Sequence, residues 1–415
     1  MTRFRLRPFW RRAILAASVA TLAVAGLSAG SASSFASTTP LLVGTLDSNP
    51  AKAATENAQG VRAAMIELNW SAYETAPGVF SSSYASSFNK RVDTLLAAGQ
   101  QVTLGLGLHY TPKWVLDLPN GRFVNQSGQA SGAANFVFSA DVRQRAANYL
   151  AKANAAMNFS RFSAIRITSG ARSELLYPSG GTYWAFDAAA QTGVGLPAGV
   201  AKSPVPGWKP GTTALSKDQV RSWALWYVDS LASTAGWLTS TVRNLGYDNA
   251  FYLLTPGVGV TPVRFDQLTS GTTLPNGTLG VGAYWYEIYR QLKDVPGMTA
   301  YVSSMADGSG SNDSCSPSDP GVSMFTKVPA NWSAARWIAR IADEFGLPKS
   351  GENPGHHDST AQRSFYTSTE NEGMAGVVFR QARSCGFSSV FWAHDKQLWD
   401  GTMTLKDLTT AGGLS

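Results

Sequence analysis

The sequence predicts an α/β fold, a single (β/α)8 TIM barrel with extended loops on the C-terminal face of its strands. Short apolar runs rich in β-branched residues recur along the chain, and amphipathic stretches of helical length separate them. Strands that alternate with helices form a parallel sheet that is buried on both faces. The chain of 415 residues exceeds the roughly 250 residues of an ordinary barrel, which favours a closed barrel with long loops.

Each element of this barrel is predicted from its own stretch of sequence. The strands are expected at Leu41–Leu46, Ala63–Asn69, Val102–Leu108, Ala164–Thr168, Ala250–Leu254, Thr299–Ser303, Leu347–Gly351 and Val390–Ala393. The helices are expected at Tyr84–Ala98, Asp141–Asn158, Lys217–Leu245, Gly282–Lys293, Trp332–Phe345 and Asn371–Ser384. A glycine that favours a left-handed C-cap follows four of these helices, at Gly99, Gly246, Gly346 and Gly386. Residues 193–213 and 307–321 are predicted as long loops after the fourth and sixth strands.

Residues 1–36 are predicted as a cleaved signal peptide, and residues 37–415 as the barrel domain. Arginines precede an apolar segment, Ala13–Leu27, and small residues follow it, with Ala32 and Ala36 as suitable ends for cleavage. The alternative is a retained membrane anchor, but a spanning helix needs about 20 apolar residues. We therefore expect a secreted protein, exported by the Sec or Tat route, without membrane attachment after cleavage.

The charge and the motifs exclude several classes of function. The chain carries a net charge of +7, but its first 36 residues contain five arginines and no acidic residue, so the remainder carries only +2. Without a basic stripe, nucleic acid is not an expected partner. No phosphate-binding glycine loop and no Gly-x-Ser-x-Gly elbow follows a predicted strand. The cluster His356-His357-Asp358 lacks the spaced partners of known metal sites. We expect no cofactor, no metal and a monomer.

The two cysteines, Cys315 and Cys385, are expected to be unpaired. Cys315 is predicted in the loop after the sixth strand, at the top of the barrel. Cys385 ends the helix before the eighth strand, which places it near the bottom. A disulfide requires Cα atoms within about 7 Å of each other.

Two glutamates follow the ends of predicted strands. Glu174 lies shortly after the fourth strand, and Glu352 lies at the end of the seventh. Carboxylates at the C-terminal ends of barrel strands point into the mouth of the barrel. Glycoside hydrolysis requires two such groups, an acid that protonates the leaving oxygen and a carboxylate that attacks or activates water. We predict that Glu174 and Glu352 are this catalytic pair.

Several segments resemble β-amylases. Glu174 begins Glu-Leu-Leu-Tyr-Pro-Ser, which is similar to that family's fourth-strand segment, and Gly351-Glu352-Asn353 resembles its Gly-Glu-Asn. The resemblance implies that Glu174 is the general acid and Glu352 the general base. It also implies that His109 and Glu67 bind sugar. Residues 112–117 and 125–128 are similar to the segment after the third strand.

The sequence departs from β-amylases in two places. His109 is followed almost directly by Pro112, so the family's mobile lid is missing, and its inner loop before the seventh strand is not found. The segment with Trp70, Glu74 and Pro77-Gly78-Val79-Phe80 is also similar to barrel β-galactosidases. On the β-galactosidase side, Glu352 would be a nucleophile and the anomeric configuration would be retained. A transglycosylase with the same pair and a non-catalytic glycan-binding barrel remain open.

The predicted function is therefore a secreted glycoside hydrolase that acts on a poly- or oligosaccharide. Aromatic rings offer flat apolar faces to sugars, and polar groups at strand ends can bind hydroxyls. The residues predicted to bind the substrate are Glu67, His109, Trp114, Tyr177, Asn353, Trp392 and Asp395. The substrate's sugar, linkage and anomer are not predicted.

Overall fold

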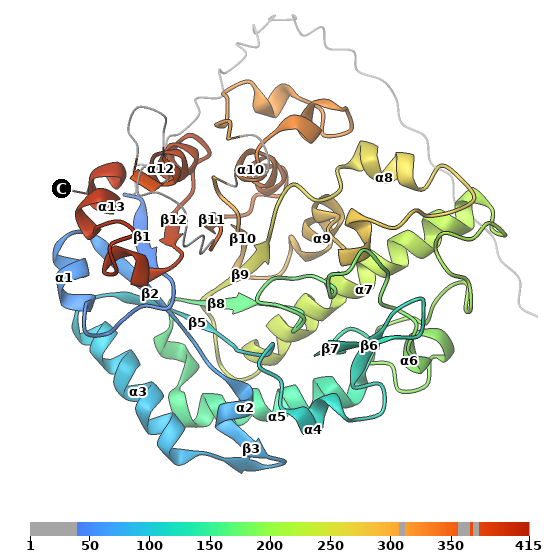
Figure 1. Cartoon of the computed structure of the whole chain (residues 1–415), viewed down its shortest axis with the longest axis horizontal. Coiled ribbons are helices and arrows are strands. Elements are labelled where there is room, and N and C mark those ends of the chain that lie inside the picture. Colours follow the sequence, from blue (N-terminus) through green and yellow to red (C-terminus); the bar gives the residue numbers. More distant parts are fainter. Residues whose placement is uncertain (1–39, 307–311, 356–365, 368–372, 415) are drawn as a thin grey trace, which may run out of the picture. The chain divides into compact units, whose positions relative to one another are not determined.

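A closed barrel of parallel strands forms the centre of the protein, and helices surround it (Figure 1). The structure is a computed structural model that describes residues 40–306, 312–355, 366–367 and 373–414. Around the barrel the strands follow one another in chain order, and the last pairs with the first. The predicted (β/α)8 barrel is confirmed. The predicted signal peptide and the cluster His356-His357-Asp358 lie outside the described residues.

Each predicted strand overlaps one strand of the barrel. The barrel strands are β1 (Leu42–Thr45), β2 (Val61–Glu67), β5 (Gln101–Gly105), β8 (Ala164–Ile167), β9 (Ala250–Thr255), β10 (Met298–Val302), β11 (Lys349–Glu352) and β12 (Ser389–Trp392). All neighbouring pairs in the barrel are parallel. Two small antiparallel pairs lie outside it, formed by β3 (Glu74–Ala76) with β4 (Val79–Phe80) and by β6 (Arg122–Val124) with β7 (Ala130–Ala134).

The six predicted helices are also present. They are α3 (Ser82–Ala97), α5 (Ala140–Met157), α7 (Lys217–Arg243), α9 (Trp285–Leu292), α10 (Ala334–Glu344) and α12 (Met374–Ser384). Serine side chains cap the first turns of α3, α5, α7 and α10, because each accepts a hydrogen bond from a free backbone N–H there. The glycines predicted as C-caps all have positive φ, between 66° and 90°.

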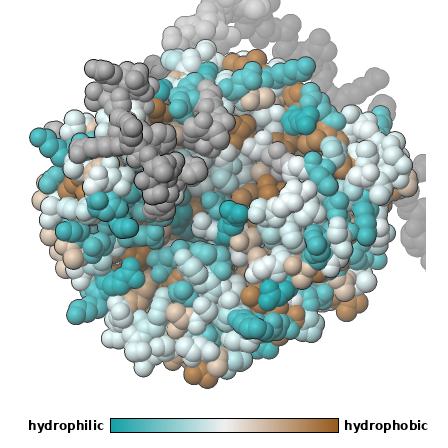
Figure 2. Space-filling view, in the orientation of Figure 1, coloured by the Kyte–Doolittle hydropathy of each residue, from teal (hydrophilic) through white to brown (hydrophobic). Residues whose placement is uncertain are grey.

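Shorter helices lie in the loops and at the end of the chain. They are α1 (Ala53–Ala58), α2 (Trp70–Tyr73), α4 (Lys113–Leu116), α6 (Ala188–Thr192), α8 (Pro262–Leu268) and α13 (Leu405–Gly412). Single 3-10 turns are η1 (Phe159–Arg161), η2 (Thr278–Val281), η3 (Asp319–Gly321), η4 (Val328–Asn331) and η5 (Asp395–Leu398). In the part of the chain that the structure describes, no helix combines the length and apolarity of a membrane span. On the face seen in Figure 2, hydrophobic side chains are scattered among polar ones.

Side chains alternate along each strand between the barrel interior and the surrounding helices. In β8, Ala164 belongs to the inner apolar cluster, whereas Ile165 and Ile167 pack against the helices. The same period places Tyr301 of β10 and Phe391 of β12 inside the barrel. In each strand, every second residue therefore points into the barrel, and we call this alternation the parity of the residue. The inward-facing residues nearest the C-terminal strand ends form the floor of the barrel's mouth.

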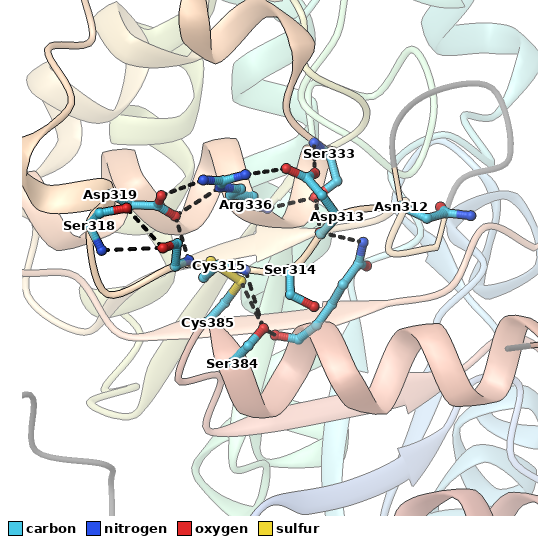
Figure 3. A network of polar contacts seen from close by, with 12 residues as sticks. Asn312, Asp313, Ser314, Cys315, Ser318, Asp319, Ser333, Arg336, Ser384 and Cys385 are labelled. Carbon is cyan, nitrogen blue, oxygen red and sulfur yellow. Dashed lines mark hydrogen bonds and ion pairs between the residues drawn. A yellow bond between two sulfur atoms is a disulfide. The ribbon is translucent and has the colours of Figure 1, made fainter.

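The prediction that the two cysteines are unpaired is wrong. Cys315 and Cys385 form a disulfide with their Cα atoms 5.0 Å apart (Figure 3). The error lies in the expected course of the loop after β10. Instead of staying at the mouth, this loop runs beside α12, where Arg380 binds Asn312 and Ser314, and the Cys315 N–H donates to the Ser384 hydroxyl.

A second set of contacts holds the same loop against α10. The guanidinium of Arg336 binds the carboxylates of both Asp313 and Asp319 (Figure 3). Asp313 also accepts a hydrogen bond from the backbone N–H of Ser333, the residue that caps α10. The loop is thus attached to two neighbouring helices, and this attachment brings Cys315 to the last turn of α12.

Candidate active site

Three charged side chains point into the barrel from the C-terminal ends of their strands. Glu67 and Glu352 are the last residues of β2 and β11, and Arg166 is the last inward-facing residue of β8. Glu67 and Arg166 each lie two residues after an inward-facing apolar residue, as the period of a strand requires. Tyr301 enters the same space from β10.

Glu352 is held by two partners in this space. Nη2 of Arg166 lies 3.1 Å from each carboxylate oxygen, and the Tyr301 hydroxyl donates a hydrogen bond of 2.6 Å to Oε2. The Arg166 guanidinium also lies over the Tyr301 ring, 5.5 Å from its centre. Glu352 is 7% exposed. These contacts fix the carboxylate in position and stabilise its charge.

Burial raises the pKa of the Glu352 carboxyl above its ordinary value. The positive charge of Arg166 and the hydrogen bond from Tyr301 lower this pKa, whereas the negative charge of Glu174 raises it. Glu174 is therefore close enough to Glu352 to influence its ionisation. The pKa of Arg166 is raised mainly by Glu352, against the effect of burial, so the guanidinium remains charged.

Glu174 enters the mouth from the loop after β8. The backbone N–H of Leu175 donates to the carbonyl of Leu254, the last inward-facing residue of β9, at 3.0 Å. The hydroxyls of Thr168 and Ser169 bind the Glu174 carbonyl from the other side. The loop is thus attached at the strand ends of β8 and β9. The half-buried Glu174 side chain is more accessible than that of Glu352.

Glu67 and His109 lie together on another side of the mouth. Oε1 of Glu67 is 3.8 Å from Nδ1 of His109, and both side chains are about one-fifth exposed. Burial raises the pKa of Glu67 to about 7, with Arg166 opposing the shift. Burial and the positive charge of Arg166 lower the pKa of His109 to about 4, so this imidazole is neutral at pH 7. Gly105 leaves room for the carboxylate, because a Cβ there would lie 2.8 Å from Oε1.

The structure also brings Asp47 and His394 to this end of the barrel. They follow β1 and β12, and Nδ1 of His394 lies 2.6 Å from the Asp47 carboxylate. This contact is the main cause that lowers the pKa of Asp47, and the charge of His394 in turn lowers that of Glu352. The sequence reasoning missed both residues, although each lies two positions after a strand end.

Two of the predicted sugar-binding aromatic residues are packed into the structure instead. Trp392 has the wrong parity in β12, so it faces the helices, where its Nε1 donates to Gln397. Tyr177 stacks on Tyr227 with ring centres 4.0 Å apart, and its hydroxyl donates a hydrogen bond to the backbone carbonyl of Tyr227. Trp114 is half-buried on α4, and its substrate role stays a prediction.

Two predicted polar ligands are likewise used within the protein. Asp395 is fully buried and accepts hydrogen bonds from the Asn49 backbone and the Trp399 ring. Asn353 is 1% exposed, and its amide exchanges two hydrogen bonds with the backbone of Ala393. Asn353 therefore joins the ends of β11 and β12 and orients the residues beside them, and the substrate-binding roles of Asn353 and Asp395 stay predictions.

Comparison with known proteins places this fold among solved glycosidase structures. No family model matches the sequence, and no curated protein matches it. The catalytic domain of a β-amylase from Paenibacillus polymyxa is similar with a TM-score of 0.60 and 15% identity, over 89% of this chain and 97% of that one. The likeness establishes the barrel fold.

Two β-galactosidases are also similar. The enzyme from the psychrophilic Marinomonas ef1 has a TM-score of 0.55 at 11% identity, and that from the haloarchaeon Halorubrum lacusprofundi has 0.56 at 12%. Each match covers 90% of this chain but only 59% and 58%, respectively, of the β-galactosidase. These likenesses, too, show the barrel fold.

Proposed function

We propose that this protein is a glycoside hydrolase that cleaves O-glycosidic bonds of a poly- or oligosaccharide. Glu174 is the general acid that protonates the leaving oxygen, and Glu352 is the general base that activates water. The main support for the proposal is that these two carboxyl groups, both at the mouth of the barrel, have different environments. Glu352 is buried and held by Arg166 and Tyr301, whereas Glu174 lies in a more accessible loop within electrostatic range.

This asymmetry matches the two roles. A group that acts at the anomeric carbon must be ionised and fixed in position, and Arg166 and Tyr301 supply both conditions to Glu352. A group that protonates a leaving oxygen must reach the bond from the other side of the sugar ring. The structurally similar β-amylase and β-galactosidases support glycosides as the class of substrate.

A second mechanism uses the same pair with Glu352 as the nucleophile. The similarity to β-galactosidases favours it nearly as much as the β-amylase similarity favours inversion. A carboxyl separation of about 5–5.5 Å predicts retention, and about 6.5–9.5 Å predicts inversion. We expect inversion, so NMR of the first product should show the opposite anomer. If the first product retains the anomeric configuration, Glu352 is the nucleophile and not a general base.

Glutamine variants test the pair. We expect Glu174→Gln and Glu352→Gln each to lower kcat on the susceptible glycan by about 10² to 10⁴-fold. Glu344→Gln, at the last residue of α10, is the matched control and should retain full activity. With an aryl glycoside whose leaving group needs no proton, Glu174→Gln should recover most of its rate, whereas Glu352→Gln should not.

The opposite results have distinct meanings. Unchanged cleavage by both glutamine variants would refute the catalytic assignment. If the wild-type protein binds glycans without cleaving any member of a panel of α- and β-linked substrates, the protein is a glycan-binding barrel. Transfer of the sugar to an added alcohol or sugar instead of water would identify a transglycosylase.

We also propose that the protein is exported and that residues 1–36 are its signal peptide. The basic and apolar segments described above support this proposal. The N-terminal sequence of protein recovered from the culture medium should begin after Ala32 or Ala36. Recovery of the full-length chain in the membrane fraction would show that the segment is a retained anchor.

A further inference from the structure

A groove separate from the carboxylate pair lies between α8 and the turn η4. It has a volume of about 520 Å³, within the range of ligand pockets. The loop after β9 and helix α8 form one wall, and residues 327–331 form the other. Its lining includes Val263, Arg264 and Gln267 on one side and Lys327, Ala330 and Asn331 on the other. We call it the α8 groove.

The segments that line the α8 groove follow the C-terminal ends of β9 and β10, the same strand ends that carry the candidate active site. The first lining residue of the groove, Val258, comes three positions after the end of β9. The backbone N–H of Gly257 donates to the hydroxyl of Ser304 at 2.7 Å, and Ser304 follows the end of β10. The loop that forms the groove is thus joined to the strand that carries Tyr301. A polymer bound across the mouth can extend in this direction.

The charge of the groove is entirely positive. Arg264 and Lys327 come from separate segments and line the same space, and no acidic residue is among the described lining residues. The nearest acidic residue on α8, Asp266, forms an ion pair with Arg221 at 2.7 Å. Neither groove cation has a carboxylate partner within ion-pair distance among the residues that the structure describes. Among the described residues, the Arg264 guanidinium contacts the Gln267 side-chain oxygen at 3.4 Å.

The remaining lining is suited to a sugar unit. Gln267 and Asn331 carry side-chain amides that both donate and accept hydrogen bonds. Val258, Val263 and Ala330 offer apolar contacts for the C–H groups of a sugar ring. A small inorganic anion would use the two cations but not the apolar wall. The combination fits a sugar that carries a negative charge.

We propose that the α8 groove binds a negatively charged sugar unit of an acidic glycan, through its carboxylate or sulfate group. The inference rests on the proposed glycoside hydrolase function and narrows its substrate to acidic polysaccharides. Arg264 and Lys327 bind the anionic group, and the catalytic pair cleaves the same chain at the mouth. Arg264 and Lys327 therefore determine specificity and take no part in the bond cleavage.

Binding to defined oligosaccharides tests this proposal. The probes are oligogalacturonates and chondroitin sulfate oligosaccharides, each paired with its neutral counterpart, carboxyl-reduced or desulfated. Calorimetry with the Glu352→Gln protein measures binding without turnover. We expect at least one anionic probe to bind about tenfold tighter than its neutral counterpart, and we expect added salt to weaken that binding. The pair that shows the difference identifies the carboxylate or the sulfate.

Charge reversal then locates the binding. The double variant Arg264→Glu/Lys327→Glu, in the same Glu352→Gln protein, should weaken anionic binding about tenfold or more and leave neutral binding within about twofold. Arg145→Glu/Lys217→Glu is the matched control, because it changes the charge equally at exposed residues outside the groove. Equal binding of both members of every probe pair would overturn the proposal. Equal anionic affinity of the double variant and the control would also overturn it.

The outcome is separable from that of the proposed function. If the wild-type protein cleaves no glycan but the groove still distinguishes anionic probes, the hydrolase proposal fails and the binding site stands. If the protein cleaves glycans through Glu174 and Glu352, and the double variant leaves KM and kcat unchanged on every one of them, the groove proposal fails and the hydrolase proposal stands.

Discussion

The hydroxyl of Tyr301 should control the pH at which the enzyme becomes active. It donates a 2.6 Å hydrogen bond to Oε2 of Glu352, and this bond lowers the pKa of that carboxyl. Tyr301→Phe removes the donor and leaves the ring in place. Because Glu352 must be ionised to act, the acidic limb of the pH profile of kcat/KM reports its pKa. The limb should therefore move to higher pH.

The size of this shift follows from the strength of the bond. A hydrogen bond to a charged group contributes about 1.5–3 kcal/mol. One pH unit corresponds to about 1.36 kcal/mol, so the limb should move up by about 1 to 2 units. The ion pair with Arg166, 3.1 Å from each oxygen, remains and prevents a larger shift.

Tyr252→Phe is the matched control. Tyr252 faces the same interior and stacks on Tyr301 with ring centres 5.1 Å apart, but its hydroxyl contacts Ser389 rather than a carboxylate. Its removal changes packing without changing the charge environment of Glu352. The reasoning is refuted if the acidic limb of Tyr301→Phe stays within about 0.3 units of the wild type, or shifts equally in Tyr252→Phe.

Three further changes should affect stability. Replacing Cys315 and Cys385 by serine opens a loop of 70 residues, so the free energy of unfolding measured by urea titration should fall by up to about 4 kcal/mol. The kcat should stay within about twofold of the wild type, and an unchanged free energy of unfolding would contradict the prediction. Burial raises the pKa of Glu67 from 4.5 in the unfolded chain to about 7, so folding favours the protonated carboxyl. The stability that this group contributes is fully present below pH 4.5 and is lost as the pH rises through 7. Glu67→Gln should therefore have a higher Tm than the wild type at pH 8 and no advantage at pH 4, and a constant difference would contradict the assignment. Burial and Asp395 raise the pKa of Glu56 to about 8, so ionisation of Glu56 should lower the wild-type Tm as the pH rises from 5 to 8. Glu56→Gln should reduce this fall in Tm, and an equal fall in the variant would exclude Glu56 as its cause.

The barrel could be predicted from sequence because its strands are buried on both faces. Strands such as β9 are nearly continuous apolar runs, and helices with a clear apolar side lie between the strands along the chain. The ends of the helices were less accurate, since capping determines them. Helix α3 begins after Ser81, and α10 begins after Ser333, where a serine hydroxyl takes the place of a missing backbone partner.

The partners of Glu352 could not be predicted in the same way. Arg166 and Tyr301 are separated from it by 186 and 51 residues, and their contact depends on the stagger between strands around the barrel. The course of the loop after β10 is similarly set by its contacts with α10 and α12 rather than by any local pattern. The incorrect prediction for Cys315 came from assuming that a loop stays where its strand ends.

The parity of a residue within its strand, by contrast, follows from its position alone once one inward-facing residue of that strand is known, and it separates site residues from their neighbours. Tyr301 has the parity of Thr299 and lies inside, so an inward-facing hydroxyl near the mouth could be expected. Trp392 follows the inward-facing Phe391 by one residue, and this position alone directs its ring toward the helices. An aromatic ring at the end of a strand is thus a candidate for sugar binding only when its parity is that of the barrel interior. Residues beyond the strand end escape this rule, and for these only the contacts of the folded loop decide.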